Sequence, residues 1–237
     1  MARTAVIAGV GPGLGESIAR RFAAEGLDLG LLARSADYLD ELAEELEADH
    51  GIETAAVPTD LAEVEQIDAA FDAVRGALGP VDVLVNHASG GAWKGVRALE
   101  PAEMEHALRV GPLGGLRASQ HAVEDMLAGD GGTVIFTGAT SSVRGNDGAA
   151  AFSAAKFAVR GLAESMARDL GPEGVHVAHV VIDGQILPPS AEGGTAGRDE
   201  EEFLDPDAIA DTYWHLVEQD RSSWSLEVDV RPHVEAF

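Results

Sequence analysis

The segment FSAAKFAVRG, from Phe152 to Gly161, carries one of only two lysines in a chain of 237 residues. Lys156 lies in an alanine- and serine-rich stretch typical of a half-buried helix, where an ammonium group is costly unless its charge is satisfied. The lysine therefore either binds a polar or anionic group, or extends its head to water along a buried stem. One helical turn earlier stands the apolar Phe152, which either lines a pocket or belongs to the ordinary core.

A second candidate site is a glycine cluster between an apolar run and an amphipathic one. Alternating glycines permit a tight turn that brings the backbone close to a diphosphate, and the N–H groups of the following helix point toward negative charge. The strand–turn–helix context favours a nucleotide site over a purely structural turn. The residues expected at the phosphates are Gly9, Gly11, Pro12, Gly13, Leu14 and Gly15.

The elements that must position these groups alternate along the whole chain. Near-continuous apolar runs separated by amphipathic stretches predict a doubly wound α/β fold, a parallel sheet covered on both faces. Ser35 is expected to cap a helix over 36–49, and Asp205 with Pro206 to begin another. Residues 187–204 are expected to form a mobile insertion. The seven predicted strands are 4–8, 28–33, 54–58, 81–86, 133–137, 175–182 and 225–230.

Taken in order, these motifs resemble those of the short-chain dehydrogenases/reductases over essentially the whole chain. The glycine spacing Gly9-xxx-Gly13-x-Gly15 is similar to theirs, and "NHAS" (86–89) resembles their "NNAG", with His87 in place of the second Asn. The resemblance implies one Rossmann-type domain over residues 1–237, with 187–204 as the substrate loop. It also implies a small-molecule substrate and dinucleotide contacts beyond the glycines, at Asp60, Leu61, Asn86, Ala88, Lys156, Gly184 and Ile186.

The end of the second strand indicates which dinucleotide is preferred. An acidic residue there would bind the ribose hydroxyls of NAD, but this chain has Ala33 followed by Arg34 and Ser35. A guanidinium suits a 2′-phosphate by charge and by bidentate geometry, so NADP(H) is favoured over NAD(H). The alternative is that Arg34 lies in solvent or at a helix end. Pro12 stands where many NADP-preferring relatives carry a second cation.

The resemblance also implies a catalytic Tyr, Ser, Lys and Asn, of which only Lys156 is present. Phe152, Ala139 and Gly111 stand at the other three positions. The chain has two tyrosines, and neither precedes a lysine by four residues. Thr140 is a weak substitute for the lost hydroxyl. Two further groups follow predicted strands: Asp183, which could titrate usefully, and His87, which could do so or be structural.

Two hypotheses follow. The first is an NADP(H)-dependent short-chain oxidoreductase that transfers hydride to or from a small carbonyl or alcohol with an atypical proton donor. The second is a catalytically silent dinucleotide-binding protein, a sensor or an oligomer partner; an acidic interaction module without nucleotide is a weaker third. The resemblance implies a homo-oligomer, a dimer or tetramer, formed through helices over 104–128 and 148–170.

Composition narrows the range of partners. A net charge of −25 argues against binding to nucleic acid or to anionic membranes. Acid excess with scarce lysine is similar to the composition of proteins from salt-loving organisms, where salt screens the self-repulsion. The chain has no cysteine, and its eight histidines show no metal-binding spacing, so no metal is expected. The absence of a long apolar run and of a signal-peptide pattern predicts a cytoplasmic protein.

Overall fold

A computed structural model describes residues 2–189, 195 and 197–235. Its centre is a seven-stranded parallel sheet in the order β3-β2-β1-β4-β5-β6-β9. The seven expected strands are all present, and the bounds of three differ by one or two residues. The strands are β1 (Thr4–Ala8), β2 (Asp28–Ala33), β3 (Thr54–Pro58), β4 (Val83–Asn86), β5 (Gly132–Thr137), β6 (Val175–Ile182) and β9 (Glu227–Val230).

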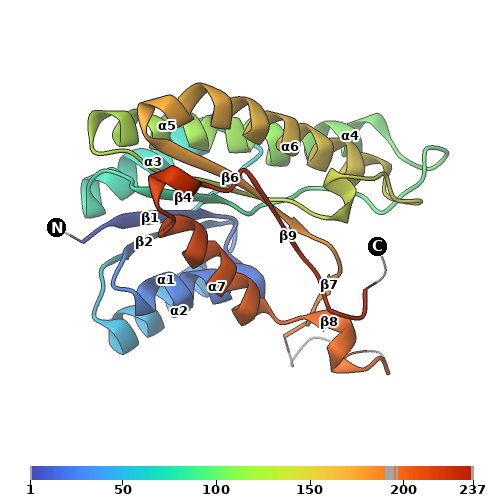
Figure 1. Ribbon diagram of the computed structural model, residues 1–237, viewed down its shortest axis with the longest axis horizontal. Helices are drawn as coiled ribbons and strands as arrows, with labels where there is room; N and C mark the ends of the chain where they lie inside the picture. The colour runs from blue at the N-terminus through green and yellow to red at the C-terminus, as the bar shows by residue number, and fades with distance from the viewer. Residues whose placement is uncertain (1, 190–194, 196, 236–237) are drawn as a thin grey trace.

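Helices cover both faces of this sheet (Figure 1). On one face lie α1 (Leu14–Ala24), α2 (Ala36–His50) and α7 (Pro206–Val217), which bury one of the two main apolar clusters. On the other lie α3 (Val64–Leu78), α5 (Gly114–Ala128) and α6 (Ala150–Leu170), which bury the second, and α4 (Pro101–Leu108), which packs on α6 in a small third cluster. The near-continuous apolar strands are explained by this double cover. No helix in the part of the chain that the structure describes is long and apolar enough to cross a membrane.

The sheet order places the ends of several strands at one edge. β1 pairs with β2 on one side and with β4 on the other, so the order of the strands along the chain reverses at β1. A crevice forms at the carboxyl ends of the strands at such a point. The residues that follow β1, β4, β5 and β6 at that edge are Gly9, His87, Gly138 and Asp183.

Two local expectations need correction. The helix expected over 104–128 is divided by a π-helical turn at Arg109–Leu113, because Pro112 inside it has no N–H to donate and its ring displaces a preceding carbonyl. Ser35 occupies the N-cap of α2, but its side chain makes no capping hydrogen bond. Asp205 does cap α7, because its carboxylate accepts the N–H of Asp207.

The segment 187–204, expected to be a mobile loop, is only partly described, since residues 190–194 and 196 lie outside the described part. Its end contains a strand that the sequence pattern did not predict: β8 (Phe203–Leu204) pairs in parallel with β7 (Gln185–Ile186). This small second sheet holds the end of the segment beside the residues that follow β6.

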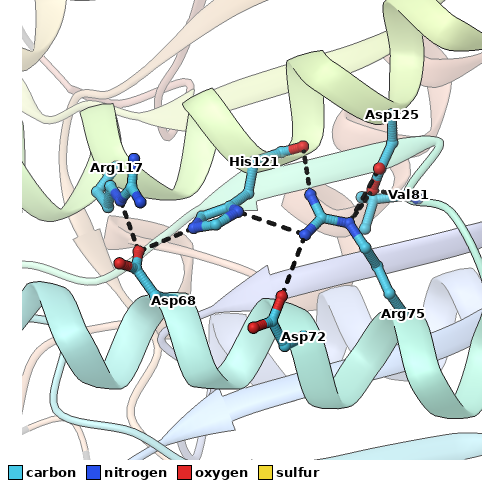
Figure 2. A network of polar contacts seen from close by, with 7 residues as sticks. All are labelled: Asp68, Asp72, Arg75, Val81, Arg117, His121 and Asp125. Carbon is cyan, nitrogen blue, oxygen red and sulfur yellow. Dashed lines mark hydrogen bonds and ion pairs between the residues drawn. The ribbon is translucent and has the colours of Figure 1, made fainter.

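A polar network joins α3 to α5 (Figure 2). Asp68 accepts hydrogen bonds from Arg117 at 2.5 Å and from His121 at 2.8 Å. Arg75 donates to Asp125 at 2.9 Å and to the carbonyl of His121 at 2.9 Å. The hydrogen bond from Arg117, and then that from His121, lowers the pKa of Asp68 to about 2. The network fixes α5 against α3, and α5 in turn packs against strands β4 and β5.

Candidate functional site

The turn after β1 has a shape that only glycine permits at two positions. Gly9 has φ 110°, and a Cβ there would lie 2.5 Å from the backbone nitrogen of Ala88. Gly13 has φ 96° and occupies the N-cap of α1, where no side chain caps the helix. A Cβ on Gly11 would meet nothing within 4 Å, so this part of the turn faces open space. The turn therefore exposes backbone to a cleft and aims the start of α1 at it, as a diphosphate requires.

A first cavity, of about 550 Å³, lies over this turn. It brings together most of the residues expected to contact a dinucleotide. Four expected residues line neither this cavity nor the second one described below. Gly13 is the N-cap of α1, Leu14 and Gly15 are buried, and Asn86 donates from its amide to Ser119 at 3.1 Å beside a small void. The expected residues that line the first cavity are Gly9, Gly11, Pro12, Arg34, Ser35, Asp60, Leu61 and Ala88.

Arg34 stands at the rim of the first cavity with an uncommitted guanidinium. Its side chain is exposed, and among the described residues it has no hydrogen-bond or ion-pair partner. Twelve of the thirteen other arginines, all but Arg97, form ion pairs or hydrogen bonds with acidic groups, amides or carbonyls, as Arg20 does with Glu16 and Glu45. A free guanidinium at the end of β2 can accommodate a phosphate by charge and by geometry.

A second cavity, of about 740 Å³, adjoins the first, and His87 and Ser89 line both. We call the region around these two residues the junction. Lys156 and Phe152 from α6 line the second cavity, and Gly184 and Ile186 line it from the exit of β6. Neither tyrosine of the chain is among its lining residues.

Lys156 is buried, with only 5% of its surface exposed, so its head does not reach bulk water along a buried stem. Its ammonium donates to the carbonyl of Thr137 at 2.7 Å, and no carboxylate of the described residues lies within ion-pair distance. Burial lowers the pKa of Lys156 from 10.5 to about 8. The site thus holds an uncompensated cation that lines a cavity and has donor capacity to spare.

Phe152 lies beside this lysine, with Lys156 Nζ 5.6 Å from its ring centroid. Trp93 packs on the same ring, with centroids 5.2 Å apart, and a Cβ on Gly91 would lie only 3.0 Å from the Cβ of Phe152. Phe152 and Trp93 therefore form an aromatic wall of the second cavity, so Phe152 lines a pocket and is not part of the ordinary core.

The other residues at and near the lost catalytic positions do not all line the second cavity. Ala139 and Thr140 line the second cavity, whereas Gly111 lies in the π-helical turn, where a Cβ would be 3.6 Å from Ala155 and 3.7 Å from Val159. Thr140 donates its hydroxyl hydrogen to Asp183 at 2.6 Å, and Asp183 also forms an ion pair with Arg231 at 3.2 Å. Thr140 consequently has no hydrogen left to donate to a ligand.

His87, for which the sequence left open a titrating or a structural role, occupies the junction. Burial, and then the positive charge of Lys156, lowers the pKa of His87 to about 4, so the imidazole is neutral at pH 7. The available signal was its place directly after β4, at the crevice edge. No group of three or more potential metal ligands occurs among the residues that the structure describes.

Comparison with known proteins gives one consistent result. Residues 3–187 match the family model described as short chain dehydrogenase. The chain is 26% identical over 233 residues to an uncharacterized oxidoreductase of Staphylococcus aureus (strain N315), covering 97% of each. It superposes with TM-score 0.89, at 26% identity, on an alcohol dehydrogenase from the archaeon Thermococcus sibiricus complexed with 5-hydroxy-NADP, covering 100% and 99%. A metagenomic short-chain oxidoreductase in complex with NADP gives TM-score 0.84 at 28% identity, covering 98% of each.

Proposed function

The chain belongs to the short-chain dehydrogenase family, and we propose that it is an NADP(H)-dependent oxidoreductase that interconverts a small carbonyl compound and its alcohol. The observation that carries the proposal is Lys156, a buried ammonium that lines a cavity adjoining the glycine-turn cleft and has no carboxylate partner among the described residues. NADP(H) supplies or accepts the hydride when bound. The two solved structures bound to NADP-type dinucleotides support this choice of cofactor.

The same site supports Lys156 as the proton donor in carbonyl reduction. A general acid works best when its pKa lies near the operating pH, and the pKa of Lys156 is about 8. The hydroxyl of Thr140 is committed to Asp183, and Phe152 has no proton to give. As the carbonyl carbon receives hydride, the ammonium gives one proton to the carbonyl oxygen, which yields the alcohol and leaves Lys156 as a neutral amine.

The test is oxidation of NADPH with a panel of aldehydes, ketones and enones, in molar salt and again at low salt because of the net charge of −25. Turnover of at least one carbonyl class is the expected result. Tight NADPH binding with no turnover of any compound would instead favour the silent dinucleotide-binding protein. Failure to bind either dinucleotide would contradict both.

Replacing Arg34 by serine is expected to weaken NADPH binding roughly tenfold, because a charge-assisted contact to the 2′-phosphate is lost at an exposed site. Binding of NADH, which has no such phosphate, is expected to change by less than about twofold. Dissociation constants for both cofactors, measured by fluorescence titration, check this. The control is Arg168→Ser on α6, which is as exposed and far from the cleft. Equal losses for both cofactors would contradict the assignment.

A homo-oligomer is part of the proposal. Large apolar side chains are exposed near α5 and on α6, where Leu113 is 53% and Phe157 45% exposed. Beside Phe157, Ala158 and Gly161 are also exposed, and small residues let a second helix approach closely. Covering this face with a second copy of the chain would remove apolar area from water and so stabilise the assembly.

A further inference from the structure

His87 occupies a fixed place between the two cavities. It follows β4 directly, and its Cδ2 lies 3.3 Å from the position that a Cβ on Gly15 would take, so the ring packs against the start of α1. Because it lines both cavities, any ligand that extends from the first cavity into the second passes this ring. The position of the imidazole hydrogen therefore decides whether His87 offers that ligand a donor or an acceptor.

A buried row of hydrogen bonds starts at this ring. Nδ1 of His87 lies 3.1 Å from Oγ1 of Thr137, and the same Oγ1 lies 2.7 Å from the hydroxyl oxygen of Tyr213. Thr137 ends β5, and Tyr213 comes from α7, beneath the sheet. Tyr213 is fully buried, and burial raises the pKa of its phenol, so the hydroxyl keeps its hydrogen. In the described structure Thr137 is the only hydrogen-bond partner of that hydroxyl.

Only one order of donors satisfies every hydrogen in this row. If Tyr213 donates to Thr137, and Thr137 donates to Nδ1 of His87, each buried hydroxyl hydrogen has an acceptor. If Nδ1 carries the hydrogen instead, either the phenolic hydrogen or the threonine hydrogen has no acceptor among the described residues. A buried donor without a partner reduces the population of that arrangement roughly tenfold or more. The favoured tautomer of His87 therefore carries its hydrogen on Nε2.

Nε2 of His87 has no hydrogen-bond partner among the described residues. The one fully buried side-chain nitrogen or oxygen of the described residues without such a partner is Nε2 of His179. Nε2 of His87 is absent from that group, so it is not fully buried, and its ring lines both cavities. A neutral N–H donor suits this place, because a second cation would be repelled by Lys156.

We propose that the hydroxyl of Thr137, which accepts from Tyr213 and donates to Nδ1, holds His87 as the neutral Nε2–H tautomer, which donates a hydrogen bond to an oxygen atom of the ligand at the junction. The donor role rests on the proposed function, whereas the tautomer is a property of the free protein. The ligand oxygen belongs to a carbonyl, carboxamide, hydroxyl or phosphate group. Its source is either the dinucleotide or the substrate, and these are separated by experiment.

The tautomer is tested by nitrogen NMR of protein with ¹⁵N-labelled histidine and no ligand. We expect His87 to show a protonated Nε2 and an unprotonated Nδ1 at neutral pH, and the exposed His50 provides the reference resonances of a histidine outside both cavities. Tyr213→Phe keeps the buried volume, and Thr137 can still donate to Nδ1, so the Nε2–H form should persist in this variant. Thr137→Val removes the hydroxyl that donates to Nδ1, so the Nδ1–H form should appear. A protonated Nδ1 in the wild type or in Tyr213→Phe, or an unchanged tautomer in Thr137→Val, would overturn the proposal.

The donor role is tested by adding NADPH, and then propanone with NADP⁺, to the labelled protein. A shift of the Nε2 resonance with NADPH assigns the oxygen to the dinucleotide, and a shift only after propanone assigns it to the substrate. If neither shifts it while NADPH binds, the donor role fails and the proposed function stands. Wild-type protein that binds no dinucleotide overturns both.

The binding affinity of the ligand tests the donor role of His87 independently. His87→Phe is expected to weaken binding of the ligand that shifts Nε2 roughly three- to tenfold, and His87→Asn, which keeps an N–H donor, is expected to recover most of this loss. Equal binding by His87→Phe and the wild type would contradict the donor role.

Discussion

Replacing Lys156 by methionine is expected to make the protein more stable and nearly inactive. The fall of the lysine pKa from 10.5 to about 8 corresponds to about 3 kcal/mol that burial costs the charged form. Methionine fills a similar volume without charge and loses one hydrogen bond, to Thr137, worth about 1 kcal/mol. We expect the free energy of unfolding to rise by about 2 kcal/mol at pH 7, as measured by urea denaturation.

Activity is expected to change in the opposite direction. Loss of a general acid costs roughly 10²–10⁴-fold in rate, so the kcat for carbonyl reduction should fall by that factor in the methionine variant. This combination distinguishes a functional lysine from a structural one, because a lysine that stabilised the fold would lower both quantities when removed. The control is Lys94→Met: Lys94 is exposed and pairs with Glu103 at 2.6 Å, so neither quantity should change much.

The pH dependence of stability and of the reduction rate tests the role of Lys156 independently. The pKa of Lys156 is lower in the folded protein, so the unfolded chain binds more protons between about pH 8 and 10.5, and wild-type stability should rise across that range. The methionine variant lacks this rise, so the stability difference should shrink as pH increases. In the wild type, kcat/KM for reduction should be level below about pH 8 and fall above it, as the ammonium loses its proton. A reduction rate that rises above pH 8 would contradict Lys156 as the donor.

How much of the site the sequence predicts depends on how locally each feature is encoded. The glycine turn can be predicted from the sequence, because the positive φ at Gly9 and Gly13 and the close approach of Ala88 require residues without side chains. The strands are predicted for the same reason, since burial on both faces makes them continuously apolar. The division of the helix over 104–128 follows from Pro112, a residue that disfavours a continuous helix and is visible in the sequence.

Features made by distant residues could not be predicted in the same way. Thr137 and Tyr213 are 76 residues apart and meet only because α7 packs beneath β5, so nothing local to His87 indicates its hydrogen-bond row. Thr140 and Asp183 are 43 residues apart, and their contact changes Thr140 from a possible donor into an acceptor. The sequence shows which polar groups follow the strands, but the donor and acceptor roles require the pairings of the folded chain.

Restoring the missing hydroxyls should test whether the second cavity is otherwise suited to reduction. Phe152→Tyr places a phenol beside Lys156, which lies 5.6 Å from the present ring and would lower the pKa of that phenol by its charge. Ala139→Ser adds a hydroxyl to the cavity lining. We expect the double variant to reduce carbonyl compounds roughly 10²-fold faster than the wild type, measured as NADPH oxidation, because tyrosine and serine are then available to donate to the carbonyl oxygen.

Adding Gly111→Asn has a less direct effect, since a Cβ there meets Ala155 and Val159 at ordinary contact distances but the position lines only a small void. We therefore expect most of the gain in the double variant and a further severalfold at most in the triple one. The decisive control is Phe152→Tyr with Lys156→Met, which supplies the phenol without the cation. If that control gains as much as Phe152→Tyr alone, the phenol is not activated by the lysine. If the double variant binds NADPH as the wild type does and gains nothing, the carbonyl does not bind beside Phe152, and the aromatic wall of Phe152 and Trp93 does not border the reaction site.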